Sequence, residues 1–175
     1  MRATQPVRLR ANGVDYTGEA EPRTTLADFL RRQCGLTGTH VGCEHGVCGT
    51  CTLLVDGAAV RSCLLLAVQA DGCEVTTIEG LADNSDRANP VLGPVQQAFA
   101  DAMSFQCGFC TPGIVMSTVA WLDARPEGSD APTDHEIREF LAGTLCRCTG
   151  YTSIVEGVRL AAARYSASEA SAAAP

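Results

Sequence analysis

The stretch Gly42–Cys51, GCEHGVCGTC, together with Cys63, sets how the first half of the chain must fold. It carries four cysteines at the spacing C-x4-C-x2-C-x11-C, namely Cys43, Cys48, Cys51 and Cys63. Three glycines lie among them: Gly42, Gly46 and Gly49. Glycine reaches positive φ without steric cost, and such backbone lets N–H groups point at a small anion. The stretch is therefore suited to closing around a compact anionic group that is held by thiolates.

This spacing is that of plant-type [2Fe–2S] ferredoxins, in which cysteine thiolates hold the cluster. A zinc site usually has two short cysteine pairs, so a triplet with one distant partner fits zinc poorly. A disulfide framework suits a short secreted chain, and no signal segment opens this sequence. The sequence favours an iron–sulfur site, with zinc and disulfides as the alternatives.

Composition narrows the class of protein further. The chain has 175 residues, of which 46% are hydrophobic and 19% charged, enough for one or two small globular domains. A formal net charge of −7 argues against nucleic acid and anionic membranes as partners. No apolar run is long enough to span a bilayer. Ten cysteines without a secretion signal indicate a reducing compartment, so we expect a cytoplasmic protein.

The first domain, residues 1–80, is predicted to be a small α+β unit of the β-grasp type. Asn12-Gly13 and Asp56-Gly57 are hairpin-turn signals. Thr25 is expected to cap a helix in which Asp28 reaches back, and Gly35 to end it. The predicted strands are a hairpin over residues 6–20 and the runs 52–55, 58–62 and 74–78.

The second domain, residues 91–165, is predicted to be a four-helix bundle. A polar linker over 81–90 precedes it, and a frayed tail over 166–175 follows. Thr111 is expected to cap the second helix, with Pro112 in its first turn. Thr133 and Glu136 form a capping-box pattern that opens the third. The predicted helices cover residues 91–103, 114–123, 133–141 and about 151–165.

A second set of cysteines lies in this bundle, at the spacing C-x2-C-x35-C-x-C: Cys107, Cys110, Cys146 and Cys148. The residues between the two pairs form a helix, a turn and a second helix, so the chain returns to its starting end. Each pair also precedes a helix start, where free N–H groups favour an anionic group. Iron–sulfur is favoured here too, although paired cysteines leave zinc as a stronger alternative than before. Cys34 and Cys73 are left over and are expected to be small buried hydrophobes.

Both cysteine patterns together resemble the small iron–sulfur subunit of the molybdenum hydroxylase family, which includes xanthine dehydrogenase and aerobic carbon monoxide dehydrogenase. The resemblance covers residues 7–163. It is carried by LTGTHVGCEHGVCGTC, VRSC at Cys63, TTIEGL, QCGFCTPG and LCRCTGY. It implies a plant-ferredoxin-like first domain, a four-helix second domain particular to the family, and one [2Fe–2S] cluster in each.

The resemblance also implies a function. Substrate is oxidised at a molybdopterin-type molybdenum cofactor in a large subunit, and electrons pass through the two clusters to FAD in a medium subunit. By the same resemblance, the Cys107 cluster faces the molybdenum cofactor and the Cys43 cluster faces the flavin. Gln106 and Cys148 correspond to the residues that contact the pterin. The FAD and molybdenum modules would be separate chains, assembled as a dimer of heterotrimers.

The remaining residues suggest no chemistry of another kind. The sequence contains no nucleophile–base pair and no phosphate loop, so no side chain is assigned as catalytic. His40, His45 and His135 are scattered along the chain, and the first two are interpreted as loop residues without a functional role. The alternatives to an electron-transfer subunit are a free-standing two-cluster ferredoxin and a structural zinc protein. The substrate of the complex is not readable from this chain.

Overall fold

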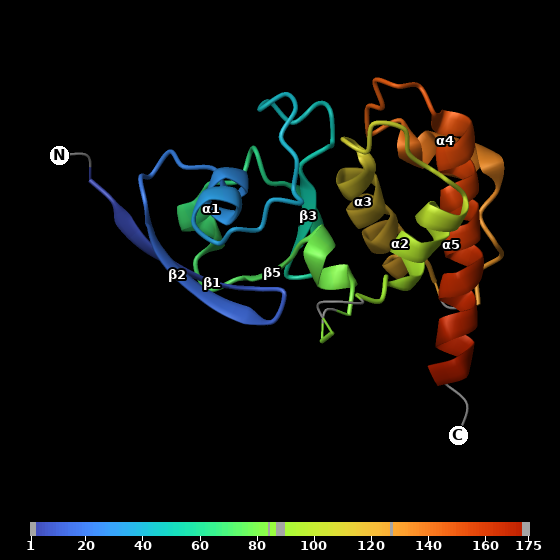
Figure 1. Ribbon diagram of the computed structural model, residues 1–175, viewed down its shortest axis with the longest axis horizontal. Coiled ribbons are helices and arrows are strands. Elements are labelled where there is room, and N and C mark those ends of the chain that lie inside the picture. Colours follow the sequence, from blue (N-terminus) through green and yellow to red (C-terminus); the bar gives the residue numbers. More distant parts are fainter. Residues whose placement is uncertain (1–2, 84, 87–89, 127, 173–175) are drawn as a thin grey trace.

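The computed structural model describes residues 3–83, 85–86, 90–126 and 128–172, with the side chains of the last helix described through Tyr165. These residues form two lobes, each around its own hydrophobic core (Figure 1). The first lobe is built on a five-stranded sheet in the order β2-β1-β5-β3-β4, in which only β1 and β5 run parallel. Its strands are β1 (Gln5–Ala11), β2 (Val14–Ala20), β3 (Thr52–Val55), β4 (Ala58–Arg61) and β5 (Glu74–Thr76).

Helix α1 (Leu26–Arg32) packs across this sheet and completes the first core. Leu26, Phe29 and Leu30 are fully buried against the inward residues of the strands, as the i, i+3, i+4 spacing requires. Thr25 caps the helix, because its side chain accepts a hydrogen bond from the Asp28 amide at 3.1 Å. The Asp28 carboxylate pairs with Arg32. The predicted α+β class is confirmed.

The second lobe consists of four helices: α2 (Pro94–Asp101), α3 (Thr111–Asp123), α4 (Asp134–Leu141) and α5 (Tyr151–Ala172). The predicted capping box of α4 is present. The Thr133 side chain accepts from the Glu136 amide at 3.3 Å, and the Glu136 carboxylate accepts from the Thr133 amide at 2.7 Å. Helix α3 is buried on most sides, which fits its nearly uniform apolar sequence.

Several predicted boundaries were wrong. The last strand ends at Thr76, and Ile78 opens a short 3-10 helix, η2 (Ile78–Leu81). Helix α2 begins at Pro94 because Val91 is held in a β-bridge with Asp83. Within the predicted linker, residues 84 and 87–89 lie outside the described residues.

The ends of α3 and α5 also differ from prediction. Cys110, not Thr111, is the N-cap of α3, and among the residues described the buried Thr111 hydroxyl has no hydrogen-bond partner. Helix α5 does not fray at Tyr165 but continues to Ala172. Alanine and glutamate in SASEASA favour helix. The final turns therefore extend beyond the rest of the bundle (Figure 1).

Strand β3 contributes side chains to the hydrophobic cores of both lobes. Successive residues of a strand face opposite sides, and here Leu53 belongs to the first core while Leu54 belongs to the second. Figure 1 shows β3 beside α3 at the centre of the molecule. Among the helices described, none is long and apolar enough to cross a membrane.

Candidate metal centres

The first cysteine set gathers around the loop that joins α1 to β3. Inside this loop the Cys48 amide donates to Cys43 Sγ at 3.4 Å, and the Thr50 hydroxyl donates to Cys48 Sγ at 3.1 Å. The distant member is brought in by Ser62, whose hydroxyl donates to the Cys51 carbonyl at 2.7 Å. The thiols therefore fall into two side-by-side pairs, Cys43 with Cys48 and Cys51 with Cys63.

The glycines of this loop serve two different purposes. Gly46 and Gly49 have φ of +81° and +74°, as expected from the sequence. The same expectation was wrong for Gly42, whose φ is not positive, whereas Glu44 has a φ of +59°. A Cβ on Gly42 would lie 3.4 Å from both Cys48 Sγ and the ring of Phe109, so this glycine provides close packing.

The protein environment shifts the pKa values of two thiols of the first set in opposite directions. Hydrogen bonding from the Cys48 amide, followed by that of His45, lowers the pKa of Cys43 to about 6. Burial raises the pKa of Cys63 to about 11. A metal must displace the proton of a ligating thiol, so binding here would release protons, that of Cys63 among them.

The second cysteine set lies where α3 and α5 begin. Cys110 is the N-cap of α3, and Cys148 lies shortly before α5. The thiols again form two pairs, Cys107 with Cys148 and Cys110 with Cys146. All four line one small cavity. The two cysteine pairs that the sequence separates by a helix, a turn and a helix are therefore brought together.

Two thiols of the second set also have pKa values shifted in opposite directions. A hydrogen bond from the Phe109 amide lowers the pKa of Cys107, which is exposed. Burial raises the pKa of Cys110 to about 12. Cys34 and Cys73 lie apart from both sets and are partly rather than fully buried. Burial raises the pKa of Cys34 to about 11, which fits its packing against the first core.

Gln106 lies beside the second set rather than inside a helix. It belongs to the loop between α2 and α3, and its Nε2 would be 3.1 Å from a Cβ placed on Gly150, just before α5. Its side chain borders the cysteine cavity and also a polar surface pocket that extends to Arg138 and Arg159. The amide of Gln106 is therefore open to a ligand that approaches this face.

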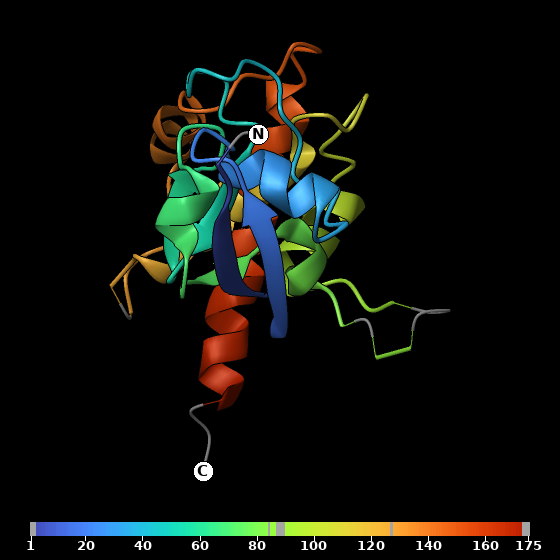
Figure 2. The ribbon, with the colours of Figure 1, turned by 90° about the vertical axis from the view of Figure 1, so that its left-hand side faces the viewer.

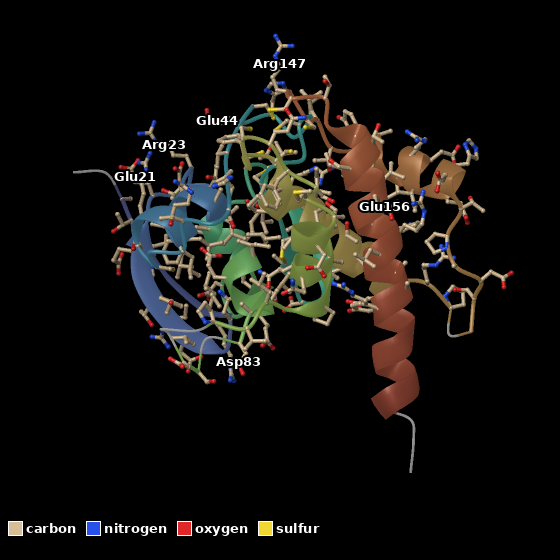
Figure 3. The ribbon with its side chains drawn as sticks, turned by 45° about the vertical axis from the view of Figure 1, so that its right-hand side comes forward. Glu21, Arg23, Glu44, Asp83, Arg147 and Glu156 are labelled. Atoms are coloured by element: carbon tan, nitrogen blue, oxygen red, sulfur yellow. The ribbon has the colours of Figure 1, made fainter. Side chains whose placement is uncertain are left out.

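The two cysteine loops are joined directly to each other. The Leu145 amide donates to the Cys48 carbonyl at 2.9 Å, and Arg61 Nη2 donates to the Gly143 carbonyl at 2.8 Å. Figures 1 and 2 show both loops at the same end of the molecule. In Figure 3, Glu44 of the first loop and Arg147 of the second project outward at this end.

Sequence reasoning missed the residues that support the cysteines. Tyr151 Oη accepts from the Cys146 amide at 2.8 Å and donates to the Thr144 carbonyl at 3.0 Å, which fixes the turn that carries the C-x-C pair. Thr50 and Arg61 were also missed. Tyr151 ends the motif LCRCTGY, so proximity to the cysteines could have suggested it, whereas Arg61 acts on Gly143, which is distant in sequence.

The donor sets fit [2Fe–2S] clusters. Such a cluster is held by four cysteine thiolates, two on each of its irons, and each set here consists of two thiol pairs. Among the described residues, no three His, Cys, Asp or Glu side chains converge as they would on a single metal ion. The amides and the Thr50 hydroxyl directed at sulfur would stabilise the negative charge of such a cluster.

Comparison with known proteins agrees with this donor chemistry. Residues 9–86 match the family described as "2Fe-2S iron-sulfur cluster binding domain", and residues 77–159 match the "[2Fe-2S] binding domain" family. The chain is 49% identical over 153 residues to caffeine dehydrogenase subunit gamma of a Pseudomonas species, covering 87% of this chain and 88% of the relative. It is 50% identical over 152 residues to the nicotine 6-hydroxylase small subunit of Paenarthrobacter nicotinovorans, covering 87% and 86% respectively.

A solved structure shares the fold over nearly the whole chain. Quinoline 2-oxidoreductase from Pseudomonas putida 86 superposes with a TM-score of 0.82 at 43% identity. The match covers 93% of this chain and 96% of that one. Both lobes therefore have a counterpart in a solved structure.

Proposed function

Because the chain belongs to the family of small iron–sulfur subunits of molybdenum hydroxylases, we propose that it relays single electrons between two larger partner subunits. The donor would be a molybdopterin centre in a large subunit, and the acceptor FAD in a medium subunit. The observation that carries this proposal is the pairing of eight thiols into two joined sets of four.

The ligands of the first [2Fe–2S] cluster would be Cys43, Cys48, Cys51 and Cys63, and those of the second Cys107, Cys110, Cys146 and Cys148. When bound, such clusters supply one-electron oxidation and reduction. Support comes from the two matching [2Fe–2S] domain families and from all ten cysteines being free thiols, which also fits a reducing, cytoplasmic location.

The chain's own residues would hold and insulate these centres. Burial of Cys51, Cys63, Cys110 and Cys146 keeps water from one side of each set. The hydrogen bond from Leu145 to the Cys48 carbonyl links a ligand of the first set to the residue beside Cys146, a ligand of the second. This is a short covalent and hydrogen-bonded connection between the two centres.

We assign the molybdenum side to the second set and the flavin side to the first. Gln106 and Cys148 adjoin an open polar pocket, and a side-chain amide offers both donors and an acceptor to the edge of a pterin. The first loop lies at the surface with Glu44 projecting outward (Figure 3). The relatives are named for different substrates, caffeine, nicotine and quinoline, although each is between 43% and 50% identical to this chain. This supports substrate selection outside this chain.

The experiment is anaerobic purification through a tag on this chain from its native host. The proposal expects two larger chains to purify with it, one containing FAD and the other molybdopterin. Rapid mixing with substrate should then reduce the second cluster before the first and the FAD last. A protein that purifies alone with both clusters would instead be a free-standing two-cluster ferredoxin.

A further inference from the structure

His40 of the first cysteine loop contacts Phe109, which lies between Cys107 and Cys110 of the second set, and the proposed relay does not explain this contact. Their rings are stacked, with centroids 4.9 Å apart and planes inclined by 15°. His40 Nδ1 lies 2.8 Å from the Phe109 carbonyl oxygen. Because a carbonyl only accepts, Nδ1 must carry the hydrogen and donate it. One histidine thus makes both a stacking contact and a hydrogen bond to one residue of the other lobe.

Phe109 bonds a cysteine of the second set and packs beside the first cysteine loop. Its backbone amide donates to the sulfur of Cys107 in the second set. Its ring lies against Gly42, at a point where an added Cβ would be 3.4 Å from both the ring and Cys48 Sγ of the first set. Any movement of Phe109 would therefore change the spacing between the two sets.

The backbone that carries His40 is anchored on two sides. Arg31 of α1 donates to the carbonyls of Thr37 and Thr39, at 2.5 and 2.8 Å. The Gly38 amide donates to the Glu79 carboxylate of η2 at 2.6 Å. The segment that presents His40 to Phe109 is therefore held in place by hydrogen bonds to both α1 and η2.

We propose that His40 is a positioning residue for electron transfer between the two centres. It acts by holding Phe109, and with it residues 107–110, at a fixed distance from the first cysteine loop. This inference rests on the proposed relay. In the step concerned, one electron leaves the second centre and enters the first, and no bond is formed or broken. Phe109 is 46% exposed, so burial in the core does not hold it in place.

The stacking contact and the hydrogen bond together hold Phe109 more firmly than either would alone. Stacking attracts the two rings to each other, and the hydrogen bond fixes the direction in which they meet. Together they restrain Phe109, whose ring is not held by burial in the core. Electron tunnelling decays steeply with distance, so a small displacement of residues 107–110 would slow transfer.

The test compares three variants in the intact, cluster-loaded complex: His40→Phe, which keeps a stacking ring but removes the hydrogen bond, His40→Ala, and Phe109→Leu. His135→Ala is the control, because His135 is an exposed histidine on α4 that pairs only with Glu139 among the described residues. Iron and sulfide content and the two electron paramagnetic resonance signals are measured first. Rates of transfer from the second cluster to the first, the magnetic splitting between them, and hydrogen exchange of residues 106–110 are measured next.

We expect His40→Ala and Phe109→Leu to slow transfer between the clusters by roughly tenfold, since small misplacements of reacting groups are costly. Reduction of the second cluster by substrate should stay at the wild-type rate. The splitting should weaken and exchange over 106–110 should rise, with His40→Phe intermediate. If His40→Ala loses a cluster, the other two variants decide.

Full clusters with wild-type transfer, splitting and exchange in all three variants would overturn the assignment of His40. A wild-type complex with only one cluster would instead refute the relay itself. The two failures are therefore distinguishable.

Discussion

At the scale of single residues, Gly113 decides how closely the two lobes approach. It lies in α3, where replacing glycine by alanine ordinarily stabilises a helix by about 1 kcal/mol. Here an added Cβ would lie 2.6 Å from the carbonyl oxygens of Gly49 and Thr50. We therefore expect Gly113→Ala to lower the free energy of unfolding, measured by denaturant titration. Gly143→Ala is the control, because its nearest contacts would be 3.6 Å away; equal effects would refute the steric account.

Gln106 offers the most direct test of the molybdenum side. Gln106→Ala should keep both clusters, weaken retention of the pterin cofactor about fivefold, as loss of one hydrogen bond would, and slow reduction of the second cluster. Gln97→Ala is the matched control, since that glutamine donates to Asp101 of its own helix. Molybdenum analysis and rapid mixing measure both effects. Full molybdenum content with wild-type transfer would make Gln106 merely structural.

The site residues that could be predicted from the sequence are those that belong to a short motif. The spacing alone identified the eight cysteines, and the structure brings them together in two sets, although their role as ligands stays a prediction. Thr50, Tyr151 and the His40–Phe109 contact were not predicted. The His40–Phe109 contact joins segments distant in sequence, and the Thr50 hydroxyl is aimed at a sulfur, so neither leaves a pattern along the chain. Tyr151 lies within the motif LCRCTGY, but only the structure shows that its hydroxyl bonds the backbone around Cys146.

At the scale of elements, the N-cap of α4 makes a measurable contribution to the free energy of unfolding. Thr133 accepts from the Glu136 amide, and replacing such a cap by alanine typically costs about 1 kcal/mol. Thr133→Ala should lower the stability of the bundle by that amount in denaturant titration of the loaded protein. Thr133→Ser, which keeps the hydroxyl, should restore it. A serine variant as weak as the alanine variant would contradict the capping explanation.

The other half of the capping box should depend on pH. Hydrogen bonding from the Thr133 amide lowers the pKa of Glu136 below its ordinary value of 4.5. A lowered folded-state pKa adds stability above the unfolded pKa, and this stability is lost as pH falls through the folded value. The destabilisation caused by Glu136→Ala should therefore be constant near neutral pH and shrink below about 4.5. A destabilisation that stayed constant below about pH 4.5 would contradict this explanation.

Elements with local signals were the predictable ones. Asn12-Gly13, Asp56-Gly57 and the Thr133 capping pattern marked turns and a helix start that the structure contains. The start of α2 was misplaced because a bridge to Asp83 holds Val91 extended. The end of α5 was misplaced because the helix propensity of the alanine-rich end was not weighed, and the helix continues to Ala172.

At the scale of the molecule, the sequence predicted two lobes but not how they join. Adjacent leucines in TLLV are compatible with any buried strand, and only the fold assigns Leu53 to one core and Leu54 to the other. The contact of Gly113 with Gly49, and of Leu145 with Cys48, likewise depends on three-dimensional docking. The domain boundaries at residues 80 and 91 remain predictions.

The central claim is that two joined sets of four cysteines hold two [2Fe–2S] clusters. The most direct test is electron paramagnetic resonance of the anaerobically purified, dithionite-reduced protein, quantified against its metal content. We expect two distinct signals of roughly one spin each, with about four irons and four sulfides per chain, two of each per cluster. Zinc in place of iron, or a single signal with half the iron, would contradict the claim for the set that lacks its cluster.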